Sequence, residues 1–368
     1  MRDRRSIIII AVAAATLLSL VSVQRAAASE TRQFAVSMSF PALAAEDGDC
    51  EAQNPDSLGI LRQALKQMGK SPDEIERMVA FSQRNNQPID ISLRGKLDGK
   101  AVDAYLYPLS VPDSQLHLVR GTTGLGFNLD GQEKPGDFVD PITGERGVDN
   151  QLARVLGCSR PWRAKIGEGG PFELSKHELI FQSAPAWLIE ISGIDSTEND
   201  DDVVVKVMLA KEPMTRDALG KPSAYMSFTA NPTHATAGNV VHGSIKNGTL
   251  TTRTFDFYMP GEPQTQAEYR FKDARMRMVF TPAGGITAFL GGYQDWSSLY
   301  VSLALGRSVN ELVASQDTPG HYYAFRKLAD AYPDPKTGQN MYISSTYQID
   351  AIPAFILYPE ASQSGRAQ

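Results

Sequence analysis

The sequence contains few of the residues from which metal and redox centres are built. Its 368 residues include two cysteines and five histidines. No C-x-x-C, C-x-x-C-H or H-E-x-x-H pattern occurs, which argues against a redox dithiol, a covalently attached haem and the common zinc sites. His234 and His242 are the closest pair of histidines, and their spacing matches no zinc or copper pattern. The remaining histidines stand alone and are expected to be structural or at the surface: His117, His177 and His321.

Basic runs and nucleotide motifs are also missing. The formal net charge is −6, and it becomes −9 without residues 1–28, which hold four basic residues and one acidic residue. This acidic balance argues against nucleic acid and anionic lipid as partners. No G-x-S-x-G elbow is present, and the pairs Gly284-Gly285 and Gly291-Gly292 precede no pattern of a phosphate-binding helix. We therefore expect neither haem nor a nucleotide as cofactor.

The N-terminus has the composition of an export signal. Three arginines within the first five residues precede a mainly apolar run over 7–23, and Ala26-Ala27-Ala28 follows. This order predicts a secretory signal peptide over residues 1–28. A retained membrane anchor is the alternative, because a run of 17 residues is near the lower limit for a membrane-spanning helix. Cleavage would leave a periplasmic or secreted protein without a membrane span, and there Cys50 and Cys158 are expected to form a disulfide.

Two amphipathic helices are predicted after Cys50. In the first, apolar residues recur at three- and four-residue spacing over 58–68. The second begins at Ser71-Pro72-Asp73-Glu74, which combines an N-cap serine, an early proline and a capping-box glutamate. Together they predict an α-hairpin that the disulfide would tether to the surroundings of Cys158.

The rest of the chain reads mainly as antiparallel strands. Asp98-Gly99 and Asn247-Gly248 are strong hairpin signals between apolar, alternating segments. Strands are expected over 89–96 and 101–108 around Asp98-Gly99, and further strands over 186–194, 203–209, 275–280 and 341–357; short helices are expected over 296–305, 309–314 and 322–331. Along 275–280, Met276, Met278 and Phe280 alternate with Arg275, Arg277 and Val279, so the first set is expected to face the core and the second mainly solvent. The expected fold is mainly β, with an antiparallel β-sandwich-like core or open barrel, an N-terminal α-hairpin and C-terminal helices. A Gly- and Asp-rich segment, 121–147, is the only break in composition. The chain is divided into two proposed regions, 29–160 and 161–368, that could still form a single domain.

Two acidic loops are candidate calcium sites, because calcium takes six to eight oxygen ligands. Residues 195–202 carry five carboxylates, among them Asp195, Asp200, Asp201 and Asp202. The second loop, 137–150, contains Asp140 and Asp149, and Asp47 and Asp49 beside Cys50 could contribute. The alternatives are a solvated hairpin loop over 195–202, and a helix cap formed by Asp149 or Asn150.

Three aromatic residues could form a platform for a sugar ring. Tyr293, Trp296 and Tyr300 are three and four residues apart, so a single helix would place them on one side. The alternative is that this stripe belongs to the core.

These observations predict an exported soluble binding or structural accessory protein, stabilised by calcium if the acidic loops bind it. Its ligand, a small molecule, a glycan or a protein, is not specified by any motif. The alternative is a secreted hydrolase that acts on glycans or esters through carboxylates. Two carboxyl groups roughly 5 to 9.5 Å apart in an aromatic-lined cleft would favour the hydrolase.

Overall fold

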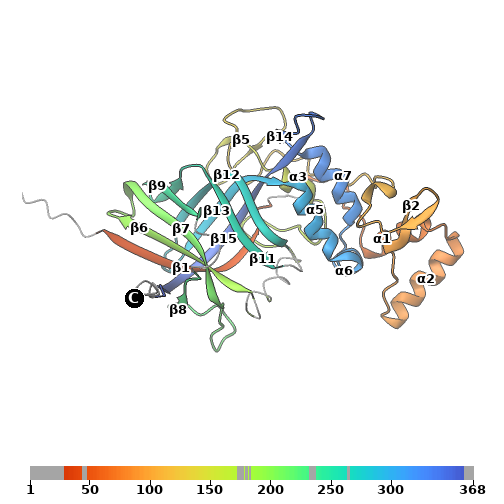
Figure 1. Ribbon diagram of the computed structural model, residues 1–368, viewed down its shortest axis with the longest axis horizontal. Coiled ribbons are helices and arrows are strands. Elements are labelled where there is room, and N and C mark those ends of the chain that lie inside the picture. Colours follow the sequence, from red (N-terminus) through yellow and green to blue (C-terminus); the bar gives the residue numbers. More distant parts are fainter. Residues whose placement is uncertain are drawn as a thin grey trace, which may run out of the picture.

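The body of the protein is a closed antiparallel barrel of eight strands (Figure 1). The computed structural model describes residues 29–43, 48–171, 178, 181, 184–231, 238–262 and 266–359. Neighbouring strands follow one another along the chain, and the last strand pairs with the first. The barrel strands are β1 (Glu30–Pro41), β6 (Pro185–Ile194), β7 (Asn199–Pro213), β9 (Val240–Lys246), β10 (Thr249–Thr252), β12 (Gln266–Phe280), β13 (Ile286–Asp295) and β15 (Asn340–Leu357).

The prediction of a mainly β, antiparallel fold is confirmed, but the prediction of a sandwich is wrong. A sandwich has two sheets with free edges, whereas each barrel strand here has a neighbour on both sides. Closure depends on pairs such as Phe34 with Pro353, which join the two ends of the chain. Hairpin signals identify neighbours within a few residues, so they carry no information about such a contact.

Apolar side chains fill the inside of the barrel. Every second residue of β7 from Val203 to Val207 is a buried valine. The same alternation buries Met276 and Met278 on β12. These residues belong to one cluster that continues into the helices at one end of the barrel. The lumen is therefore a packed core.

Two insertions carry almost all of the helices. The first runs from residue 42 to residue 184, between β1 and β6, and the second from 296 to 339, between β13 and β15. Elements of the first are α1 (Ser57–Gln67), α2 (Pro72–Asn85), the 3₁₀ turns η1 (Ser92–Arg94) and η2 (Pro108–Ser110), β2 (Gly95–Leu97), β3 (Lys100–Val102), β4 (Phe138–Val139), β5 (Arg146–Val148) and α3 (Gln151–Leu156). Elements of the second are α5 (Trp296–Leu305), α6 (Arg307–Leu312), α7 (Thr318–Leu328) and β14 (Ala331–Pro333).

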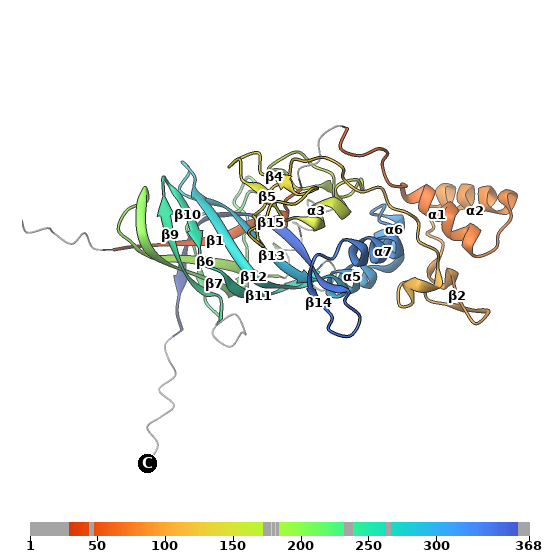
Figure 2. The same cartoon turned by 90° about the horizontal axis from the view of Figure 1, so that it is seen from above.

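Residues 54–114 form a unit that we call the helical module. It contains α1, α2, η1, η2 and the β2–β3 hairpin. Figures 1 and 2 show α5–α7 next to one end of the barrel and α1 and α2 beyond them. Helix α1 contacts α6, and α5 contacts β12, β13 and β15. The module is thus joined to the barrel largely through the second insertion.

Local signals in the module and around it are confirmed. Ser71 and Glu74 form the capping box of α2, and Cys50 is bonded to Cys158, 108 residues later. Asp98-Gly99 turns β2 into β3 with both φ angles positive, although the strands are shorter than predicted. Within the described ranges, no helix is both long and apolar enough to cross a membrane.

Three further strands of the same sheet lie outside the closed path, and one of them is β14, which pairs with β15. β8 (Met226–Thr229) pairs in parallel with the end of β15, and β11 (Phe255–Glu262) pairs with β12. Residues 121–150 cover the outer face of β13 through a cluster that includes Phe127 and Phe289. Because of this cover, Arg277, on the face of β12 predicted to meet mainly solvent, is only 8 % exposed.

Two hairpin turns share the sequence Asp-Pro-x-Thr-Gly, at 140–144 and 334–338. In each turn, the aspartate carboxylate accepts the backbone N–H groups two and three residues later. The glycine N–H donates to the carbonyl oxygen of the same aspartate at 2.8 Å in both turns. Asp140 is fully buried and Asp334 is partly exposed, so one local structure occurs in two environments.

Candidate functional site

Two carboxylates of the 195–202 loop, those of Asp200 and Asp202, have partners within the protein. Asp200 accepts the backbone N–H groups of Asp195 at 2.7 Å and Asp202 at 3.1 Å. Asp202 also lies 2.7 Å from the Nδ1 atom of His242. Asp201 is exposed at the start of β7, which begins at Asn199 and so includes half of the predicted loop.

Asp140 and Asp149 belong to the 121–150 cover, and both are buried. The carboxylate of Asp140 accepts a hydrogen bond from the Nη2 atom of Arg277 at 2.7 Å. Burial opposes ionisation there, but the backbone N–H of Thr143 and the charge of Arg277 lower the pKa of Asp140. Asp149 accepts the N–H of Leu129 at 2.8 Å, and burial raises the pKa of Asp149 to about 6. The helix cap predicted here is supplied by Asn150, which accepts the N–H of Ala153.

The described part of the chain brings no three histidine, cysteine, aspartate or glutamate side chains together in a way that could hold a metal ion. Asp47, His177, His234 and the predicted signal peptide lie outside the described residues. Calcium binding by the acidic loops therefore stays a prediction from the sequence.

The three predicted platform aromatics do not share one helix. Tyr293 lies in β13 and contacts the ring of Tyr332, whereas Trp296 and Tyr300 belong to α5. All three are buried, and the hydroxyl of Tyr300 donates to the carbonyl oxygen of Tyr105 at 2.7 Å. The single-helix prediction is wrong because β13 continues to Asp295, whose side chain caps α5.

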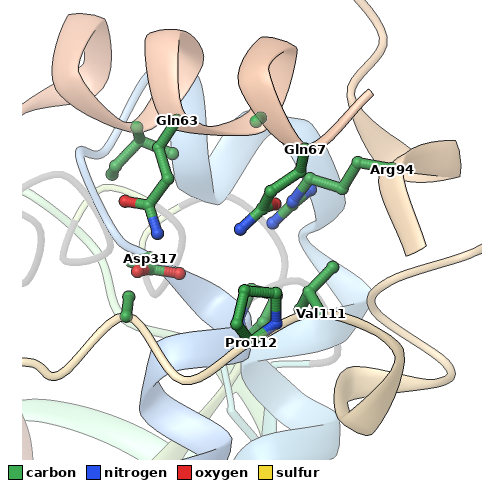
Figure 3. A pocket seen from close by; sticks show the side chains of 10 residues that line it. Gln63, Gln67, Arg94, Val111, Pro112 and Asp317 are labelled. Atoms are coloured by element: carbon green, nitrogen blue, oxygen red, sulfur yellow. The ribbon is translucent and has the colours of Figure 1, made fainter. Parts of the chain in front are cut away.

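A cleft lies between α1 and the beginning of α7 (Figure 3). We call it the module cleft; its volume is about 250 Å³ including the open mouth. Four of its residues come from one face of α1, since they are spaced by three and four positions. Figure 3 shows Gln63 and Gln67 extending from α1 towards Asp317 and Pro112. The lining residues are Ile60, Gln63, Ala64, Gln67, Arg94, Val111, Pro112, Ser114, Asp317 and Pro319.

Asp317 supplies the carboxylate of the module cleft. It is 8 % exposed, and its Oδ1 atom accepts the N–H of Gly320 at 3.1 Å, which caps α7. Its Oδ2 atom is buried without a hydrogen-bond partner, as are Gln67 Oε1 and Ser114 Oγ. A Cβ atom at Gly320 would lie 2.4 Å from Ser114 Oγ and 2.8 Å from Asp317 Oδ2. The glycine therefore keeps the floor of the cleft open.

A buried ion pair between Arg94 and Glu311 lies beside the cleft. The Nη2 atom of Arg94 is 2.8 Å from the Oε1 atom of Glu311. Glu311 also accepts the hydroxyl of Tyr105 at 2.8 Å and the N–H of Thr318 at 3.0 Å. Both charged side chains are almost inaccessible to solvent. Burial raises the pKa of Glu311 to about 7, against the opposing charge of Arg94.

His321 adds no charge to this cluster. Its Nδ1 atom lies 2.6 Å from the carbonyl oxygen of Asp317, and a carbonyl can only accept, so Nδ1 carries the hydrogen. Burial lowers the pKa of His321. The neutral imidazole leaves one guanidinium, Arg94, to balance Glu311 and Asp317.

A wider depression on the outer face of β9 and β10 is less suited to bind a ligand. Its volume is about 760 Å³, and polar side chains such as Lys246, Thr251 and Arg253 line it. Among its described residues, no side-chain polar atom is buried without a partner. It is thus an open polar surface, whereas the module cleft holds fixed, desolvated groups.

Sequence reasoning missed the residues of the module cleft. Asp317-Thr318-Pro319 combines an N-cap and an early proline, so it could have placed the start of α7, which was expected at Tyr322. Arg94 and Glu311 carry no such local signal, because they are 217 residues apart in the sequence.

The module cleft offers binding groups more than a catalytic pair. Its lining contains one carboxylate, Asp317, and no aromatic side chain. The neighbouring Glu311 is directed to Arg94, Tyr105 and Thr318. This arrangement can hold a polar ligand by hydrogen bonds and charge. No family model, curated protein or solved structure matches this chain.

Proposed function

We propose that the protein is an exported binding protein whose ligand site is the module cleft. The observation that carries this proposal is the unpartnered Oδ2 atom of Asp317, buried at the floor of a cleft lined by polar side chains. Buried polar groups normally have hydrogen-bond partners, and those that lack one concentrate where a ligand or water binds. The Cys50–Cys158 disulfide supports export, because disulfides persist in oxidising compartments.

The position of the cleft also supports binding. One wall comes from the helical module and the other from α7, so a ligand would contact segments about 200 residues apart. The alternative function, a hydrolase acting through two carboxylates, is less well supported, because only one carboxylate lines the cleft.

A fragment panel tests this proposal. Ligand-observed NMR would be recorded with small cationic, neutral and anionic polar fragments on the full chain and on Gly320→Ala. The added methyl group would meet Ser114 Oγ and Asp317 Oδ2, so we expect a fragment that binds the wild type to lose its signal in the variant. A thermal melt of Gly320→Ala controls for folding. If no fragment of any charge binds, or if binding is equal in both proteins, the proposal is wrong. Turnover of an ester or glycan that Asp317→Asn abolishes would instead establish the hydrolase.

A further inference from the structure

The cluster around the module cleft lacks one positive charge. Arg94 is paired with Glu311 at 2.8 Å, and its guanidinium also interacts electrostatically with Asp317. His321, which contacts the carbonyl of Asp317, is held neutral by burial. Above about pH 7, where Glu311 is ionised, the carboxylates of Glu311 and Asp317 outnumber the single guanidinium of Arg94 in a site shielded from water. A buried charge that no partner balances is unfavourable.

We propose that the module cleft binds a compact organic cation that carries N–H donors, such as an ammonium or amidinium group. This inference rests on the proposed function and names the chemical class of its ligand. The cation would lie against Asp317 Oδ2 and balance the excess negative charge.

The hydrogen-bonding groups of the cleft fit this class. Asp317 Oδ2 and Ser114 Oγ can both accept an N–H, and both are buried without a partner. The amides of Gln63 and Gln67 point into the same space (Figure 3) and can turn either their oxygen or their nitrogen towards a ligand. A ligand with N–H groups can therefore satisfy several acceptors at once.

An anion would find no free cationic partner there. The Nη1 atom of Arg94 donates to the carbonyl oxygen of Ile91 at 2.8 Å, and its Nη2 atom donates to Glu311. The sides of the cleft include Ile60, Val111 and Pro319, which suit a short hydrocarbon part. The enclosed part of the cleft measures only about 10 Å³, which is room for one water-sized group, so a single N–H head group would enter it and the rest of the ligand would lie in the open mouth.

Three isosteric probes separate charge from shape. Acetamidinium, acetamide and acetate have the same heavy-atom skeleton and carry a positive, zero and negative charge. Each would be titrated by NMR into the wild type, Asp317→Asn and Asp295→Asn. Asn remains a good N-cap, so Asp317→Asn removes the charge and keeps the cap of α7. Asp295→Asn is the matched control, since Asp295 caps α5 and does not line the cleft.

We expect acetamidinium to bind the wild type about tenfold more tightly than acetamide, because a charge-assisted hydrogen bond replaces a neutral one. Asp317→Asn should remove this preference, and Asp295→Asn should preserve it. Equal or tighter binding of acetamide or acetate, lost in Gly320→Ala, would refute the cation and leave the binding function intact. Absence of binding by all three probes and by the wider fragment panel would refute both. A preference for acetamidinium that survives Asp317→Asn would place the cation elsewhere and overturn this inference.

Discussion

Two buried arginine–carboxylate pairs hold the first insertion, one against the barrel and one against the second insertion, and they differ in how their carboxylates are held. Arg277 on β12 binds Asp140 of the 121–150 cover at 2.7 Å. Arg94 of the helical module binds Glu311 of α6 at 2.8 Å. Each guanidinium also lies over an aromatic ring, Phe127 for Arg277 and Tyr105 for Arg94.

The difference lies in the backbone donors. Asp140 accepts N–H groups from Ile142 and Thr143 of its own turn, whereas Glu311 accepts one, from Thr318. Burial raises the pKa of both carboxyls, but the donors and the arginine lower that of Asp140 overall, and the pKa of Glu311 rises to about 7. The N–H groups of a tight turn, together with an arginine, can thus keep the pKa of a buried carboxyl low, whereas an arginine, a hydroxyl and one N–H do not do so for Glu311.

Removal of the arginines should have the largest effect. Arg94→Met leaves Glu311 buried without its cation and should lower the free energy of unfolding by about 3 to 5 kcal/mol. Arg277→Met should cost less, because Asp140 keeps its two turn N–H groups. Urea denaturation measures both.

The double variant Arg94→Met/Glu311→Leu is the control for this test. Since it leaves no unpaired charge, it should recover much of the stability that Arg94→Met loses. A loss in Arg94→Met no larger than that in Arg277→Met would contradict the comparison.

The pH dependence of stability should separate the two carboxylates next. The folded pKa of Glu311 is about 7 against an ordinary 4.5, so between these values the folded state keeps a proton that the unfolded chain releases. Stability from this group is present below the lower value and is lost as the pH rises through about 7. The difference between wild type and Glu311→Gln should change by about 3 kcal/mol across this window. The readout is the free energy of unfolding at several pH values.

Asp140→Asn is the comparison, because the pKa of Asp140 is shifted downwards and that of Glu311 upwards. The folded pKa of Asp140 is below 3.8, so its contribution is present above that value and is lost only in more acidic solution. The difference between wild type and Asp140→Asn should therefore stay constant from about pH 5 to about pH 8. Parallel curves for the wild type and Glu311→Gln would show that Glu311 does not titrate in this range.

The two Asp-Pro-x-Thr-Gly turns give the test with the smallest expected change in stability. Asp140→Asn weakens the contact with Arg277 and should cost about 1 to 3 kcal/mol at neutral pH. Asp334→Asn changes the same turn at the surface, where water solvates the carboxylate, and should change stability much less. Thermal melting of both variants measures the difference. Equal losses would mean that the turn itself, and not the buried ion pair, carries the contribution of Asp140.

Short-range features of this protein were predictable from its sequence. Ser71-Pro72 predicted the start of α2, Asn247-Gly248 predicted a hairpin in which both residues have positive φ, and the two cysteines predicted their bond. Each of these depends on the conformational preferences of a few neighbouring residues or on the only available partner. The cluster expected of Tyr293, Trp296 and Tyr300 failed because the chain changes from strand to helix at Asp295.

Residue order alone was sufficient for the helix caps, the hairpin turns and the strand alternation, since these follow from backbone sterics and from hydrogen bonds within a few positions. Tertiary packing decided that the sheet closes, that Arg277 is buried and that Asp317 faces two glutamines of α1. Those outcomes require contacts between residues more than one hundred positions apart. Loop closure and burial determine such contacts, and no local pattern along the chain records them.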